Sequence, residues 1–342
     1  MKTPNHILVI RLSALGDVAM TVPVLRVFRQ HYPEVQLTVV SKAAFKPLFE
    51  GIKNLQFLEA DVYGKHKGLG LLQLAKEAKA LGVDAVADLH NVIRSKIIRK
   101  YLSLQGIATA SIDKGRQEKK ALTSNPKQLR RLKSTQQRYA DVFARLGYAI
   151  ALENHQFPPK KELGRELHNL IGSHTKKMIG IAPFAAYKSK MYPLDLMKEV
   201  VFNLNEEGHY KIYLFGGGAD EVRTLQEWDR QFENVTNIAG RLNLSEELRL
   251  ISNLDLMVAM DSSNGHLAAL YNIPVITMWG VTHPYAGFTP FNQPNEHQLV
   301  ANREEYPLIP TSVYGNKFPA EYENAMQSIP VSVVLKKISD II

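Results

Sequence analysis

Short apolar runs alternate with segments of helical periodicity along the first half of the chain. The runs that predict strands are 7–10, 36–40, 56–58 and 85–89, and the segments that predict helices are about 17–31, 71–81 and 136–146. Strands that alternate with helical crossovers are typical of a parallel sheet covered by helices on both faces. The first half therefore predicts an α/β domain.

The same alternation starts again after a polar stretch at 153–163, where two adjacent prolines indicate a linker. The predicted strands are 178–182, 211–215, 235–238, 256–260, 275–278 and 298–300, and the predicted helices are 193–207, 220–232, 245–253 and about 331–342. Two successive α/β units predict two Rossmann-like domains, with a ligand in the cleft at the carboxyl ends of their strands. We expect an N-terminal domain at 1–160 and a C-terminal domain at 161–342, and the last helix could pack back on the first domain.

The net charge of +9 conceals a difference between the two halves. Residues 1–150 hold 25 Lys and Arg against 11 Asp and Glu, whereas residues 151–342 hold 17 against 22. This asymmetry predicts that the basic half meets a polyanion, such as nucleic acid, anionic lipid or a phosphorylated or carboxylated glycan. No aromatic interleaving or nucleic-acid module accompanies the basic residues, which disfavours nucleic acid.

The absence of cysteine excludes disulfides, thiolate metal sites and a cysteine nucleophile. Arg11 and Asp17 interrupt the first apolar stretch, so we expect no secretory signal. No apolar run approaches the roughly 18 residues that a spanning helix needs. These observations favour a cytoplasmic protein, in which any membrane attachment is peripheral and electrostatic.

The first predicted strand ends in the turn Arg11-Leu-Ser-Ala-Leu-Gly16-Asp17, which leads directly into a helix. This turn differs from a dinucleotide-binding loop because it has one glycine and a carboxylate that would repel phosphate. Asp17 has two interpretations. It either stabilises the first helical turn through the helix dipole, or it serves as a base for a bound hydroxyl group.

Polar turns also follow several predicted strands of the second half. After 256–260 come Asp261-Ser262-Ser263-Asn264-Gly265-His266, and free backbone N–H groups at such a helix start can bind diphosphate. Lys188 and Lys190 precede Pro193 and could supply cations to a phosphate. The alternatives are a helix cap with a buried histidine and a solvated loop.

Two weaker features complete this set. Gly216-Gly217-Gly218 precede Asp220 and Glu221, whose carboxylates could accept hydrogen bonds from ribose hydroxyls. A basic stretch between Asp113 and Arg138 includes Lys114, Arg116, Lys119, Lys120, Lys127, Arg130, Arg131 and Lys133. Charge runs are usually solvated faces, but the basic balance of this half favours a binding role here.

The chain lacks the signatures of common metal and nucleotide sites. It has no Asp-x-Asp pair, no Gly-x-x-x-x-Gly-Lys loop and no His-Glu-x-x-His sequence. We therefore expect a reaction that does not depend on a metal ion.

Taken in order, these residues resemble glycosyltransferase family 9, the ADP-heptose:lipopolysaccharide heptosyltransferases. The matching pieces are Arg11-Leu-Ser-Ala-Leu-Gly16-Asp17 with Pro23, Asp113-Lys114 with its basic run, Lys190-Met-Tyr-Pro193, Phe215-Gly-Gly, Asp261-Ser through His266-Leu-Ala-Ala, and Gly280-x-Thr282-x-Pro284. They span nearly the whole chain. The resemblance implies an α/β protein of GT-B fold, in which two Rossmann-like domains face each other across a cleft, with acceptor on the N-terminal side and donor on the C-terminal side.

The resemblance further implies an inverting, metal-independent glycosyltransferase without a cofactor. It would move a heptose or related sugar from ADP-heptose to the lipopolysaccharide inner core, with Asp17 as general base. The residues that would bind the donor are Lys188, Lys190, Asp220, Glu221, Asp261, Ser262, Ser263, Gly265, His266 and Thr282. The residues that would bind an anionic glycolipid acceptor are Arg11, Ser13, Arg94, Lys114, Arg116, Lys119 and Lys120. Peripheral contact with the cytoplasmic face of the anionic inner membrane would follow.

The chain departs from the family pattern in two places. Ser262 and Ser263 stand where Thr and Gly are usual, and Tyr192 replaces a tryptophan. Two alternative functions stay open: a sugar-nucleotide epimerase or hydrolase of the same fold, and a non-catalytic protein that docks on anions or membrane.

Overall fold

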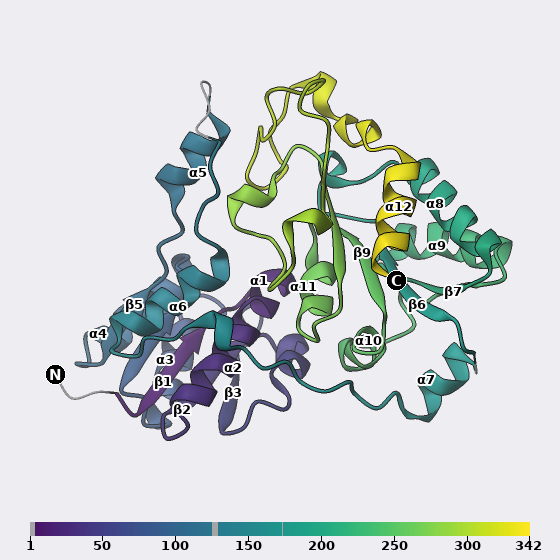
Figure 1. Ribbon diagram of the computed structural model, residues 1–342. Helices are drawn as coiled ribbons and strands as arrows, with labels where there is room; N and C mark the ends of the chain where they lie inside the picture. Colours follow the sequence, from purple (N-terminus) through teal and green to yellow (C-terminus); the bar gives the residue numbers. More distant parts are fainter. Residues whose placement is uncertain (1–3, 125–128, 173) are drawn as a thin grey trace. The chain divides into compact units, whose positions relative to one another are not determined.

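The computed structural model describes residues 4–124, 129–172 and 174–342. The chain packs as two compact units (Figure 1). Unit 1 comprises Met1–Lys114 and Ser134–Gln156, and unit 2 comprises Gly115–Lys133 and Phe157–Ile342. The segment Gly115–Lys133 thus packs with unit 2, although it lies in the first half of the sequence.

Unit 1 is built on a five-stranded parallel sheet in the order β3-β2-β1-β4-β5. Its strands are β1 (His6–Ile10), β2 (Gln36–Ser41), β3 (Leu55–Glu59), β4 (Ala85–Asp88) and β5 (Ala108–Ser111). β1 is buried along its whole length because it pairs with both β2 and β4. The chain leaves β1 in one direction and returns on its other side at β4. Ligands of open α/β sheets bind at the carboxyl ends of strands at such a switch point.

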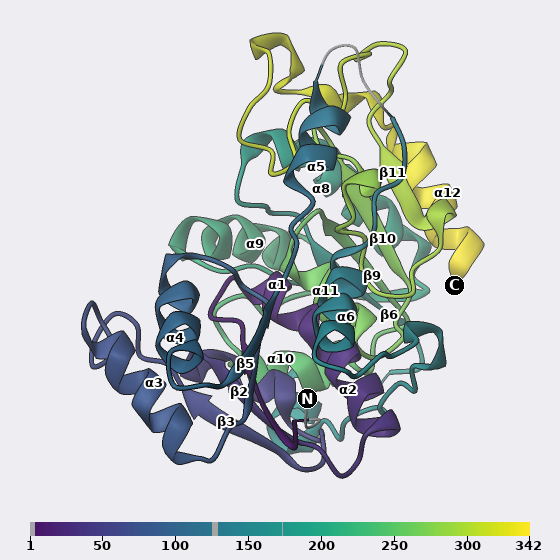
Figure 2. The same cartoon turned by 90° about the vertical axis from the view of Figure 1, so that its left-hand side faces the viewer.

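Helices cover both faces of this sheet (Figure 2). They are α1 (Leu15–Ala19), α2 (Thr21–His31), α3 (Gly70–Ala80), α4 (Ile93–Ser103) and α6 (Thr135–Arg145). α3 and α4 pack side by side on one face, where Leu74 and Ile98 join Leu8 and Ile10 of β1 in one apolar cluster. α2 and α6 pack together on the other face.

Unit 2 repeats this architecture with a six-stranded parallel sheet in the order β11-β10-β9-β6-β7-β8. Its strands are β6 (Lys177–Ala182), β7 (Tyr210–Leu214), β8 (Val235–Asn237), β9 (Leu256–Met260), β10 (Val275–Trp279) and β11 (Gln298–Val300). Its helices are α5 (Arg116–Thr123), α7 (Gly164–Ile171), α8 (Leu194–Glu207), α9 (Ala219–Gln231), α10 (Leu244–Ile251), α11 (Ser263–Ala269) and α12 (Val331–Ile341). α12, the last helix, packs on α8 within the core of unit 2. The switch point of this sheet lies between β6 and β9.

The predicted strands and helices are present, with ends that differ by at most two residues and a break at Met20 between α1 and α2. In the described part of the chain, the sequence did not predict the α-helices α4, α5 and α7 or the strand β5. β5 consists of four small residues of which one is buried, and α5 is polar with two buried residues, so neither carries a clear apolar period. α7 lies next to the predicted linker.

The basic stretch between Asp113 and Arg138 mostly belongs to unit 2. Leu122 and Leu132 pack with Ala286 in a small apolar cluster, and the backbone N–H of Leu132 donates to the carbonyl oxygen of Tyr285. Lys127 lies outside the described residues. No helix in the described part of the chain is long and apolar enough to cross a membrane.

Candidate active site

Asp17 lies in the first turn of α1, the helix that follows β1 after the turn at 11–14. Its Oδ2 atom is 2.6 Å from Nη2 of Arg11. No side chain caps the N-terminus of α1, so Asp17 makes an ion pair rather than a cap. The Asp17 side chain is 32% exposed, and its Oδ1 atom accepts no hydrogen bond from the described residues. One carboxylate oxygen is therefore anchored while the other stays open.

Three neighbours fix the Arg11 side chain in unit 1. Nη2 pairs with Asp17, Nη1 donates to the carbonyl oxygen of Leu89 at 2.9 Å, and the guanidinium carbon is 5.8 Å from the ring centre of Tyr139. Arg11 itself is buried. The hydroxyl of Tyr139 also donates to the backbone oxygen of Asp17. Arg11 and Tyr139 thus hold the turn that carries the carboxylate.

A positive environment surrounds His90, which follows β4 at the same edge of the sheet. The backbone N–H of Leu12 approaches Nδ1 of His90 at 3.4 Å. Burial lowers the pKa of His90 to about 3, with further lowering from the positive charges of Arg11, Lys114 and Arg94. His90 is therefore neutral at physiological pH, and the three cations leave this edge suited to an anionic ligand.

The residues expected to bind the acceptor divide into two groups. Arg11, Ser13, Arg94 and Lys114 belong to unit 1. Arg116, Lys119 and Lys120 belong to unit 2, on α5. Lys119 is buried with Nζ 4.0 Å from the ring centre of Phe288, whereas Arg116 and Lys120 are exposed. Arg11, Arg94 and Lys114 of the first group thus lie around His90, whereas the Lys119 ammonium packs on an aromatic ring.

A second cluster forms in unit 2 where β6, β9 and β10 end. Nζ of Lys190 is 2.8 Å from Oδ2 of Asp261, and the hydroxyl of Thr282 donates to the same oxygen at 3.0 Å. All three side chains are largely buried. Because these strands are neighbours in the sheet, their carboxyl ends bring together residues that are far apart in sequence.

Two glycines lie against the loop that carries Lys190: Gly280 of the Gly280-x-Thr282-x-Pro284 motif, and Gly315, which the sequence alone did not single out. Gly315 has φ +85°, and a Cβ atom there would lie 2.5 Å from Cδ of Lys190. A Cβ atom on Gly280 would lie 2.2 Å from the backbone oxygen of Ser189, whose hydroxyl donates to the backbone oxygen of Gly315. These close approaches fix the path of the lysine stem.

The turn after β9 opens α11 at Ser263. Ser262 is the N-cap residue in an extended conformation, and its side chain makes no capping hydrogen bond. Gly265 packs against the sheet, since a Cβ atom there would lie 3.3 Å from both Pro290 and Val275. His266 is buried in the same turn.

The other residues expected to bind the donor have different surroundings. Lys188 is exposed and pairs with Glu323, and exposed Asp220 pairs with Arg223. Glu221 accepts a hydrogen bond from the backbone N–H of Gly217 at 2.7 Å and so shapes the turn after β7. Lys188 and Asp220 therefore do not join the Lys190–Asp261–Thr282 cluster.

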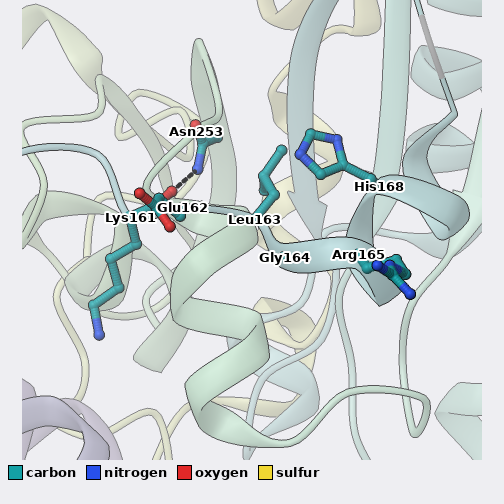
Figure 3. Close-up of a pocket in the computed structure, with 7 residues that line it drawn as sticks. All are labelled: Lys161, Glu162, Leu163, Gly164, Arg165, His168 and Asn253. Carbon is teal, nitrogen blue, oxygen red and sulfur yellow. Dashed lines mark hydrogen bonds between the residues drawn. The ribbon is translucent and has the colours of Figure 1, made fainter.

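A surface hollow of about 630 Å³ lies elsewhere in unit 2 (Figure 3). It is lined by residues 161–165 together with His168 of α7 and Asn253, whose side-chain amide donates to the backbone oxygen of Lys161. α7 precedes β6 and Asn253 precedes β9, so the hollow lies at the amino ends of the strands. It is therefore separate from the clusters described above. Among the described residues no three His, Asp or Glu side chains converge on a position that could hold a metal ion.

Comparison with known proteins gives a consistent result. The sequence model described as glycosyltransferase family 9 (heptosyltransferase) matches residues 71–319. The chain is 25% identical over 294 residues to the lipopolysaccharide core heptosyltransferase OpsX of Haemophilus influenzae, covering 83% of this chain and 81% of that protein.

Two solved structures are similar over nearly the whole chain. A family 9 glycosyl transferase from Veillonella parvula has a TM-score of 0.76 at 20% identity, covering 98% of this chain and 97% of the other. The Escherichia coli ADP-heptose LPS heptosyltransferase II has a TM-score of 0.69 at 19% identity, covering 98% of both chains. Together with the two parallel sheets, these similarities confirm the predicted α/β GT-B fold.

Proposed function

The chain belongs to glycosyltransferase family 9, and from this premise we propose that it transfers heptose from ADP-heptose to the inner core of lipopolysaccharide. The observation that carries the proposal is the Lys190–Asp261–Thr282 cluster at the switch point of the unit 2 sheet. A nucleoside diphosphate needs a fixed cation beside a strand-to-helix turn, and this cluster supplies one. The names of the similar proteins, which include ADP-heptose and the lipopolysaccharide core, support the choice of substrates.

The donor diphosphate would bind to Lys190 and to the start of α11. Asp261 pairs with the lysine and is itself held by the Thr282 hydroxyl, so the ammonium group would be positioned for the donor in advance. The Ser262 side chain makes no cap and could donate to a phosphate oxygen. Ser263, Gly265 and His266 would line the same turn. The Glu221 carboxylate, and not that of exposed Asp220, would approach the ribose.

Asp17 would act as the general base of an inverting transfer. Its open Oδ1 atom would take the proton of the acceptor hydroxyl as the new bond between that oxygen and the anomeric carbon forms. The bond from the anomeric carbon to the donor phosphate breaks at the same time, and ADP leaves with the electron pair. Arg11 would hold the carboxylate in a fixed orientation.

Positive charge for the departing diphosphate would come from the protein rather than from a metal ion. Lys190 and the backbone N–H groups of α11 would provide that charge in fixed positions. An assay with and without a chelator tests this step, and we expect equal rates.

The acceptor would bind through the positive edge of unit 1. Arg11, Arg94 and Lys114 surround neutral His90, and this arrangement suits the anionic sugars and phosphates of a glycolipid. We also propose cytoplasmic location and peripheral contact with the anionic inner membrane, because the acceptor is anchored there.

The decisive experiment measures heptose transfer from ADP-heptose to a lipid A acceptor that carries Kdo. We expect transfer that depends on both substrates, together with ADP binding measured by calorimetry. Absence of transfer together with absence of ADP-sugar binding would contradict the proposal. Release of free sugar without an acceptor would instead favour a hydrolase.

A further inference from the structure

Unit 1 exposes large apolar side chains at the edge of the sheet where its parallel strands end. Leu69, which precedes α3, is 85% exposed, and Ile93, the first residue of α4, is 78% exposed. α3 and α4 pack side by side (Figure 2), and both begin where the strands end, so Leu69 and Ile93 stand at the same edge of the sheet. Scattered single exposures are ordinary, but two large ones at one edge of a sheet favour an interaction site.

Cations surround these apolar residues. The exposed ring of Tyr63 lies 4.8 Å from Nζ of Lys42 and 5.0 Å from the guanidinium carbon of Arg94. Lys96 is exposed on the next turn of α4. We call the set Lys42, Tyr63, Leu69, Ile93, Arg94 and Lys96 the edge surface.

Two nearby carboxylates are engaged within the fold, and the edge surface itself includes no acidic residue. Both oxygens of Asp61 accept backbone N–H groups, and these hydrogen bonds lower its pKa. Glu77 pairs with Lys65 at 2.7 Å and lies close to His66. By contrast, the cations of the edge surface contact an aromatic face or solvent.

We propose that the edge surface docks on an anionic lipid bilayer. Apolar side chains that enter the headgroup region, ringed by Lys and Arg, are the combination that binds an anionic membrane surface. A tyrosine between two cations fits the headgroup level, where its ring is half immersed and its hydroxyl stays hydrated. A protein partner would require carboxylates to match these cations together with a shaped apolar pocket.

The position of the edge surface connects docking with the proposed reaction. Asp17 follows β1 at the same edge of the same sheet from which the loops to α3 and α4 depart. Docking would bring this edge to the lipid surface, where the sugar of a membrane-anchored acceptor lies. This last step rests on the proposed function, whereas membrane docking itself does not.

Vesicle co-sedimentation tests the docking. Vesicles of phosphatidylglycerol and phosphatidylethanolamine are compared with vesicles of phosphatidylcholine alone, for the full chain and for Leu69→Ser/Ile93→Ser. The matched control is Leu81→Ser/Leu104→Ser, which removes exposed leucines after the opposite ends of α3 and α4, where Leu104 is 72% exposed. We expect at least a tenfold loss of binding to anionic vesicles in the first variant alone. Lys96→Gln should weaken binding further and reduce its dependence on salt.

Several results would overturn the proposal. Equal vesicle binding by the two double variants would show that the edge surface is not the docking site. Equal binding of the full chain to anionic and neutral vesicles would show that the partner is not specifically an anionic membrane. A concentration-dependent dimer that Leu69→Ser/Ile93→Ser abolishes, without vesicle binding by the full chain, would assign the surface to a second copy of the chain.

A parallel assay separates this proposal from the proposed function. With a water-soluble, deacylated acceptor, Leu69→Ser/Ile93→Ser should transfer heptose at the rate of the unmodified chain. With acceptor in vesicles its KM should rise. If the unmodified chain transfers heptose to neither acceptor, the proposed function fails, and the vesicle measurement still decides the docking.

Discussion

Arg11–Asp17 in unit 1 and Lys190–Asp261 in unit 2 are both ion pairs in turns that follow central strands, and the two pairs are built differently. In unit 1 Arg11 is buried and fixed, while Asp17 keeps one oxygen open. In unit 2 Lys190 and Asp261 are both largely buried, and the hydroxyl of Thr282 donates a second hydrogen bond to the aspartate. The first pair presents a carboxylate, whereas the second positions a cation. Similar ion pairs thus suit a base in one unit and phosphate binding in the other.

The sharpest test of this comparison replaces Asp17 by asparagine. The amide can still contact Arg11 but cannot accept a proton, so kcat should fall by about 10²–10⁴-fold. The affinity for ADP, measured by calorimetry, should not change.

The contrasting variant is Lys190→Gln, which removes the cation and keeps a hydrogen-bond donor. Its Kd for ADP should rise at least tenfold because a charge-assisted hydrogen bond is lost. If Asp17→Asn weakened ADP binding as much as Lys190→Gln does, the two ion pairs would not have different roles.

Stability should also distinguish the two pairs. Asp261→Asn leaves the buried ammonium of Lys190 without a counter-charge and should lower the free energy of unfolding by about 3 kcal/mol. Asp17→Asn, in a pair with a partly exposed carboxylate, should lower it by roughly 1 kcal/mol. Denaturant titration of both variants measures the difference, and equal losses would show that burial does not separate the pairs.

The pH dependence of stability should have opposite signs for one titratable group in each unit. The pKa of His90 falls from 6.5 to about 3 on folding, so between these values the unfolded chain binds more protons. The contribution of His90 to the free energy of unfolding is therefore lost as pH falls, by about 3 kcal/mol between pH 6.5 and 4. Burial raises the pKa of Glu247 on α10 from 4.5 to about 7. Folding then favours the protonated form of Glu247. The free energy of unfolding therefore falls by roughly 2–3 kcal/mol as pH rises from 4.5 to 7.

Two variants check these signs by denaturant titration across the pH range. His90→Gln should flatten the acid limb of the stability curve, and Glu247→Gln should flatten the limb between pH 4.5 and 7. An unchanged acid limb in His90→Gln would mean that other groups, such as His155 or His283, dominate it.

The sequence predicted the strand-rich core because a strand buried on both sides is a short apolar run bounded by polar turns. It also singled out Asp17, Lys190 and Asp261 as candidate site residues because each follows such a strand, and their roles stay predictions. Their pairing could not be predicted, since it depends on which strands are neighbours. The sheet places the turns after β6 and β9 beside each other, although about 70 residues separate Lys190 from Asp261.

Other parts of the site leave no local signal in the sequence. Tyr139 belongs to an amphipathic helix, where a buried aromatic residue indicates only core packing, yet its ring and hydroxyl contact the Arg11–Asp17 turn. Lys119 lies in a charge run whose spacing does not reveal that its ammonium rests on the ring of Phe288. Contacts between distant segments decide the roles of such residues.

Gly315→Ala has the smallest expected effect of these variants, and it tests the Lys190–Asp261 ion pair specifically. An alanine there should cost about 1–2 kcal/mol because φ is +85°, and its Cβ atom would push on the Lys190 stem. Gly208→Ala is the matched control, since φ is +71° and nothing lies within 4 Å of the added Cβ atom. Both variants should lose similar stability, but Gly315→Ala alone should raise the Kd for ADP a few-fold. Equal ADP affinity in the two variants would show that Lys190 binds phosphate without the constraint that this glycine imposes.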